Sequence, residues 1–132
     1  MNKIVTALTA VLFAATLAPA AVAAAPSADD TRLQLTAART EGETEVIGYV
    51  WLDCPASGRP AHPHREAACH ALDAVNGDFD RLNAEPNATC TAEHAPVTLT
   101  ASGTYKGRTV DWTKTYDNNC EATRITGAVF YF

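Results

Sequence analysis

Cysteine and histidine are the residues of this 132-residue chain with the clearest capacity for chemistry. They are Cys54, Cys69, Cys90, Cys120, His62, His64, His70 and His94. An even number of cysteines in an exported chain predicts two disulfides, with three pairings open. The alternative is a zinc site, because three histidines lie near the first two cysteines. No two cysteines have the close spacing of a structural zinc site, so we expect no metal ion.

Nucleophilic catalysis needs a nucleophile beside a positioned base, and the sequence offers no such pair. Ser27, Ser57 and Ser102 are the only serines, and none lies in a G-x-S-x-G setting. Paired cysteines leave no free thiolate. The chain also has no phosphate-binding loop, no dinucleotide fingerprint and no H-E-x-x-H sequence. We therefore expect a protein that is not an enzyme and carries no cofactor.

The charge balance excludes two classes of partner. The chain has ten Lys and Arg residues and 15 Asp and Glu residues, which gives a net charge of −5 at pH 7. Nucleic-acid binding needs clustered cations, so we expect no nucleic acid as a partner. No long run of one charge and no second apolar segment follows the N-terminus, so we expect no membrane partner.

The N-terminus has the pattern of a secretory signal peptide. A positive start at Lys3 precedes an apolar run over residues 4–17, which is shorter than the roughly 20 residues that span a bilayer. Small residues at Ala21 and Ala23 then fit signal peptidase. We predict a signal peptide at 1–23, a flexible lead-in at 24–30 and one secreted, extracellular domain at 31–132. Cleavage changes the net charge to −6, because only Lys3 is lost.

The elements that must position these residues follow from periodicity and turn residues. Alternating apolar residues predict strands ending at residue 39 and over residues 46–52, and residues 40–44 form a turn. Helical spacing predicts a helix over residues 65–75 that ends at Asn76 and Gly77, with a short turn after it. Strands follow over residues 97–105 and 108–116, joined at Lys106 and Gly107, and a fifth strand covers residues 124–132. The expected fold class is α+β, with about five mostly antiparallel strands and one main helix packed on one face.

The chain from about residue 33 to its end resembles the Streptomyces subtilisin inhibitor family. The anchors are a Pro/Gly loop with Ser57, Gly58, His62 and Pro63 between Cys54 and Cys69, the helix at 69–75 before Gly77 and Asp78, Cys90 before residues 95–100, the hairpin at 103–108, the turn at 116–120 and the aromatic end at 129–132. Their order and spacing across nearly the whole expected domain make the resemblance specific.

The resemblance implies disulfides Cys54–Cys69 and Cys90–Cys120 and inhibition of subtilisin-type serine proteases by a rigid, substrate-like loop. The family's reactive bond lies two residues after the third cysteine, which places it here between Ala92 and Glu93. Asn118 matches a family asparagine that supports the loop by hydrogen bonding. The remaining residues of the protease-binding loop would be Thr89, Cys90, Thr91, His94, Ala95 and Pro96.

The sequence departs from the family pattern at the reactive bond. Ala92 replaces the long side chain that members tend to carry, and Glu93 and His94 replace residues that are commonly apolar. The expected partner is therefore an extracellular serine protease that is subtilisin-like or prefers small residues. We also expect a homodimer through a sheet face, as in the family, and a structural packing role for His62. The alternative is a non-inhibitory secreted binding or envelope protein on the same scaffold, such as a transglutaminase partner.

Overall fold

A computed structural model describes residues 20–22, 27–55 and 61–132 of the chain. The predicted signal peptide, apart from residues 20–22, and positions 56–60 of the predicted Pro/Gly loop lie outside the described residues. The elements in chain order are β1 (Thr31–Glu41), β2 (Thr44–Cys54), α1 (Arg65–Ala74), η1 (Phe79–Arg81), β3 (Val97–Tyr105), β4 (Arg108–Tyr116), α2 (Asn119–Thr126) and η2 (Gly127–Phe130).

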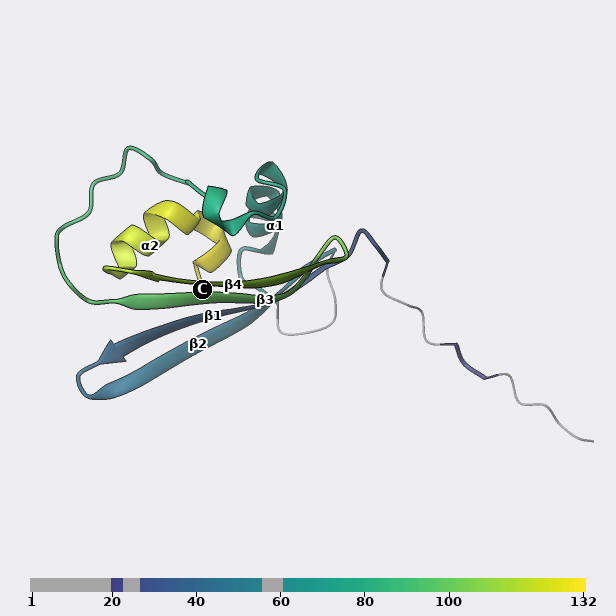
Figure 1. Ribbon diagram of the computed structural model, residues 1–132, viewed down its shortest axis with the longest axis horizontal. Coiled ribbons are helices and arrows are strands. Elements are labelled where there is room, and N and C mark those ends of the chain that lie inside the picture. The colour runs from purple at the N-terminus through teal and green to yellow at the C-terminus, as the bar shows by residue number, and fades with distance from the viewer. Residues whose placement is uncertain (1–19, 23–26, 56–60) are drawn as a thin grey trace, which may run out of the picture.

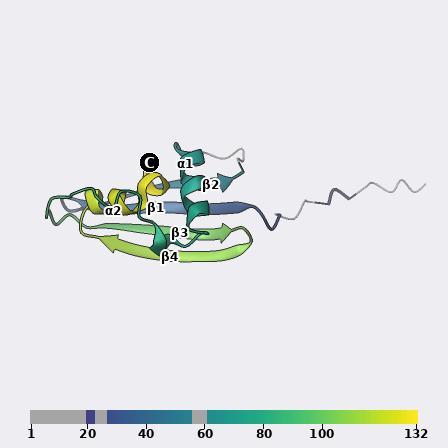
Figure 2. The same ribbon diagram turned by 90° about the horizontal axis from the view of Figure 1, so that it is seen from above.

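One antiparallel sheet forms the platform of the fold, with strand order β2-β1-β3-β4. Leu35 of β1 lies between Val50 of β2 and Ala101 of β3, so these core-facing residues share one row. Both helices cover the same face of the sheet (Figure 1). Seen from above, α2 lies toward the end where β3 begins and α1 toward the end where β3 finishes (Figure 2).

The alternation of apolar and polar residues in the strands explains which face is covered. Leu33, Leu35 and Leu52 are completely buried beneath the helices. The same cluster contains Leu72 of α1 and Val129 of η2, also completely buried. A second buried cluster lies under α2 and consists of Val97, Leu99, Tyr116 and Ala122. Each fully buried aliphatic side chain contributes roughly 1.5–3 kcal/mol, so burial of this one face holds the layers together.

The turns agree with the sequence predictions. The predicted helix at 65–75 is present as α1, and Asn76 and Gly77 follow its end with positive φ angles of 53° and 73°. Lys106 and Gly107 also have positive φ angles, 45° and 76°, between the paired strands β3 and β4. Two successive residues of positive φ match the twist of a two-residue hairpin, which is why this turn was predictable.

The prediction of a fifth strand over residues 124–132 is wrong. This segment continues α2 and then forms η2, so the sheet has four strands, and the described residues form two α-helices rather than one main helix. Ala122 and Thr126, four residues apart, are both buried, and the Thr126 hydroxyl donates to the Ala122 carbonyl at 2.8 Å. This helical spacing places both residues on one face of α2, and Ala122 packs against Val97 and Leu99 of the sheet.

His62 connects the segment before α1 to the C-terminal turn. Its ring is buried, and the His64 backbone N–H donates to its Nδ1 at 2.9 Å. The proton therefore sits on Nε2, which donates to the Val129 carbonyl at 2.9 Å. Burial lowers the pKa of His62, the bond to Val129 acts in the opposite direction, and the nearby His64 lowers it further. The structural packing role predicted for His62 is confirmed.

This buried histidine predicts a loss of stability in mild acid. Histidine titrates near its ordinary pKa of 6.5 in the unfolded chain, and the folded protein lowers the pKa of His62. The unfolded state therefore binds more protons below that pH. The contribution of His62 to the free energy of unfolding is fully present above pH 6.5 and is lost as the pH falls toward the folded pKa. Urea unfolding at about pH 7.5 and about pH 5.5 measures the loss.

Two glutamine variants provide the control. His62→Gln removes the titrating ring and should make the free energy of unfolding nearly independent of pH in this range. His70→Gln, at an exposed position of α1, should keep the wild-type dependence. A wild-type protein that is equally stable, or more stable, at the lower pH would contradict the assignment.

Candidate functional site

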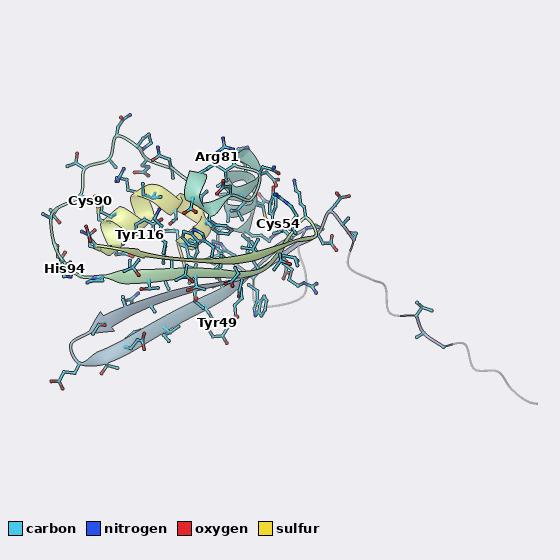
Figure 3. All side chains as sticks on the ribbon, viewed as in Figure 1. Tyr49, Cys54, Arg81, Cys90, His94 and Tyr116 are labelled. Carbon is cyan, nitrogen blue, oxygen red and sulfur yellow. A yellow bond between two sulfur atoms is a disulfide. The ribbon has the colours of Figure 1, made fainter. Side chains whose placement is uncertain are left out.

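Residues 83–96 form a long connection between η1 and β3 with no helix or strand of its own. Every residue of this loop is exposed except Cys90, which is half-buried. The loop arches outward beyond α2, and Figure 3 labels Cys90 and His94 on its outer arch. An exposed loop of this length would sample many conformations unless other parts of the protein held it.

The loop is tethered near both ends by backbone hydrogen bonds. At its start, the N–H groups of Ala84 and Glu85 donate to the carbonyls of Ile125 and Arg124, at 3.1 and 2.9 Å. Near its end, the Ala95 N–H donates to the Asp117 carbonyl at 2.8 Å. The chain then enters β3. Both sets of acceptors belong to α2 or to the residue just before its cap.

The middle of the loop is tethered covalently. Cys90 is bonded to Cys120 in the first turn of α2, and Cys54 is bonded to Cys69 between β2 and α1. These are the two pairings that the family resemblance implied, and no described cysteine is free. The Cys90–Cys120 bond spans 30 residues, so it attaches the loop to a segment far along the chain.

Asn118 fixes the backbone on both sides of Ala92. The side chain of this residue is buried, and its amide Nδ2 donates to the carbonyls of Thr91 at 3.2 Å and Glu93 at 2.8 Å. Its Oδ1 accepts from the Glu121 N–H at 2.9 Å, which caps the N-terminus of α2. One side chain thus joins the loop to the helix, as the resemblance implied for Asn118.

A shallow hollow of about 360 Å³ lies behind this part of the loop. It is lined by Cys90, Thr91, Ala92, Glu93, His94, Asp117, Asn118 and Glu121. Arg124 pairs with Glu121, with Nη2 2.7 Å from Oε2. Among the described residues, Glu93 and Asp117 take part in no ion pair. The arrangement leaves the loop exposed while holding its backbone to the N-terminal part of α2.

The described part of the chain holds no group of three or more His, Cys, Asp or Glu side chains arranged to share a metal ion. No described helix has the length and apolar character needed to cross a bilayer.

Of the predicted site residues, Cys90, Thr91, Ala92, Glu93 and His94 line one hollow with Asn118, and Thr89, Ala95 and Pro96 are their neighbours along the chain. The carbonyls of Arg124 and Ile125 also hold the loop, and they were not among the predicted site residues because a strand was expected there. A signal for the helix was present. Asn118 followed three residues later by Glu121 is a typical helix start.

Comparisons with known proteins connect this geometry to a family. The sequence profile described as subtilisin inhibitor-like matches residues 28–118. A subtilase-type protease inhibitor of Streptomyces fradiae is 36% identical over 141 aligned positions, covering 99% of both chains. Subtilisin inhibitor-like protein 8 of Streptomyces virginiae is 42% identical over 89 residues, covering 64% of this chain and 80% of its own.

A solved structure has a similar fold. Sermetstatin of Streptomyces caespitosus, crystallised in complex with subtilisin of Bacillus licheniformis, superposes with a TM-score of 0.64 at 31% identity. The match covers 78% of this chain and 99% of the sermetstatin chain.

Asn118 both caps α2 and holds the loop, and we expect that a substitution can remove the second role while keeping the first. Asn118→Ser keeps a side chain that caps helices but removes both N–H donors to the loop. The free energy of unfolding should fall by about 1–3 kcal/mol, from two hydrogen bonds worth roughly 0.5–1.5 kcal/mol each. Amide hydrogen exchange at Ala95, whose N–H donates to the Asp117 carbonyl, should become faster, which NMR measures.

The neighbouring asparagine is the matched control. Asn119 is exposed, and Asn119→Ser should change the free energy of unfolding by no more than about 0.5 kcal/mol. It should leave loop exchange unchanged. Equal exchange in the two variants would show that Asn118 does not hold the loop.

Proposed function

Because the chain belongs to the subtilisin inhibitor-like family, we propose that it is a secreted inhibitor of subtilisin-type serine proteases and that Ala92–Glu93 is its reactive bond. The observation that carries this proposal is the amide of Asn118, which donates to the carbonyls on both sides of Ala92. A protease cleft accepts an exposed stretch of backbone, and this loop is exposed and already held in shape. Preorganisation of this kind reduces the entropy lost on docking.

The proposed mechanism depends on whether the two ends of the cleaved Ala92–Glu93 bond stay close together after the protease serine has attacked. The protease serine Oγ bonds to the Ala92 carbonyl carbon, the Ala92–Glu93 C–N bond breaks, and the Glu93 amine takes up a proton. On the acyl side, Cys90–Cys120 keeps the new end attached two residues away. On the other side, the Asn118 amide holds the Glu93 carbonyl and the Asp117 carbonyl holds the Ala95 N–H. The amine therefore stays close, and resealing competes with hydrolysis.

The size of Ala92 supports a preference among proteases. Its methyl group would occupy the primary specificity pocket, where a large apolar side chain would add about 1.5–3 kcal/mol of binding. That difference corresponds to roughly 10- to 150-fold in affinity. We therefore propose an extracellular protease that accepts small residues, such as an elastase-type enzyme, as the preferred partner. The proposal also includes subtilisin-type enzymes whose primary specificity pocket accepts a small side chain.

Secretion is part of the proposal and rests on the N-terminal sequence. Cleavage after Ala23 would release the domain into the medium, where two disulfides persist. The mass of the protein recovered from a culture medium measures the cleavage position. Recovery only from the cell, with the N-terminus intact, would contradict this part of the proposal.

The open face of the sheet supports a homodimer. Ile47 and Tyr49 of β2 are 58% and 62% exposed, and Figure 3 shows Tyr49 on the side of the sheet away from the helices. Tyr49→Glu should shift the protein to monomers in sedimentation equilibrium. Tyr131→Glu is the control, because Tyr131 is 59% exposed but belongs to the C-terminal segment. A wild-type protein that is monomeric at high concentration would contradict the dimer.

Titration of the oxidised protein against subtilisin and an elastase-type serine protease tests the inhibitory function. We expect stoichiometric loss of protease activity, and tighter inhibition of the elastase-type enzyme. Mass analysis after long incubation should find one slow cut, between Ala92 and Glu93. Rapid degradation, or failure to inhibit either enzyme, would contradict the proposal and favour a non-inhibitory binding role.

A further inference from the structure

Glu93 combines a fixed backbone with an unpaired charge. Its carbonyl accepts from the Asn118 amide at 2.8 Å, so the position of the residue is set by the body of the protein. Its side chain is exposed, and no cation among the described residues pairs with it. The backbone that carries this carboxylate is therefore held at a defined place, while the carboxylate has no ion-pair partner among the described residues.

The surroundings of Glu93 do not offset its charge. Asp117 lines the same hollow and is also unpaired among the described residues. The third carboxylate of the hollow, Glu121, is already paired with Arg124 at 2.7 Å. His94 is the remaining titratable side chain of the lining. The side of the loop that follows Ala92 therefore presents two negative charges that the rest of the hollow leaves uncompensated.

Docking of a protease would remove water from Glu93, because this residue directly follows the proposed reactive bond. Burying an unpaired carboxylate weakens binding, whereas a cation on the partner converts the same group into a favourable contact. An arrangement of this type discriminates between partners by penalising those that lack the complementary charge. The residue after the bond thus acts on partner choice independently of the pocket that accepts Ala92.

We propose that Glu93 is a specificity-determining residue that selects serine proteases carrying a lysine or arginine on the leaving-group side of their cleft. This inference rests on the proposed function, in which Ala92–Glu93 is the bond presented to the protease. Together with Ala92 it defines the target class by chemistry. The target has a primary pocket for small side chains and a cationic wall where Glu93 would lie.

A double-mutant cycle tests this proposal directly. The probe is an elastase-type serine protease with a lysine or arginine on that wall, together with the same protease in which this residue is replaced by Gln. Wild type and Glu93→Gln are measured against both forms. We expect Glu93→Gln to raise the inhibition constant about tenfold or more against the cationic protease. Against the neutral protease the variant should inhibit as well as the wild type, or better.

Glu66→Gln is the matched control, because it removes the same charge from an exposed position on α1. It should leave both inhibition constants unchanged. If Glu93→Gln had the same effect on both protease forms, or if Glu66→Gln reproduced its effect, the selectivity assigned to Glu93 would be overturned while the inhibitory function stood. Failure of the wild-type chain to inhibit either form would overturn the proposed function itself.

Discussion

The attachment of an exposed loop to residues 117–125 is the constraint on which the proposed site depends. The loop buries almost no side chain of its own, so its shape comes from the backbone bonds to Asp117, Arg124 and Ile125, the disulfide to Cys120 and the amide of Asn118. The same contacts that hold the loop also stabilise the helix α2. A helix of eight residues is marginal by itself, and α2 is stabilised by its cap, its disulfide and its packing on the sheet.

The rest of the fold keeps that helix in place. Ala122 packs on Val97, Leu99 and Tyr116, which come from the two strands nearest the loop. Beyond α2, the chain turns into η2, where Val129 is buried and its carbonyl is held by His62. The other end of the molecule is secured separately. There Cys54–Cys69 joins β2 to α1, and the Tyr105 hydroxyl donates to Asp73 at 2.7 Å.

Local patterns predicted the platform of the fold well and its C-terminal part poorly. Alternation in β1 and β2, and the Lys106–Gly107 turn, are decided by near neighbours and could be read from the sequence. Residues 124–132 were misassigned because Ile125, Val129 and the final aromatic residues favour strands when burial is unknown. In the folded protein, packing on the sheet and the Asn118 cap stabilise the helix α2 instead. The proposed site was predictable only through the family resemblance, since residues 89–96 by themselves are an ordinary exposed loop.

We propose that the Cys90–Cys120 disulfide, together with the Asn118 amide, makes this loop an inhibitor rather than a substrate. The most direct test incubates subtilisin with equimolar wild type, Cys90→Ser/Cys120→Ser and Cys54→Ser/Cys69→Ser, and follows intact chain and protease activity together. Each double variant loses a disulfide worth roughly 3–4 kcal/mol, but only the first loses the tether. The account predicts lasting inhibition by wild type and Cys54→Ser/Cys69→Ser, and rapid cutting after Ala92 with recovery of activity for Cys90→Ser/Cys120→Ser. Equally lasting inhibition by Cys90→Ser/Cys120→Ser would contradict it.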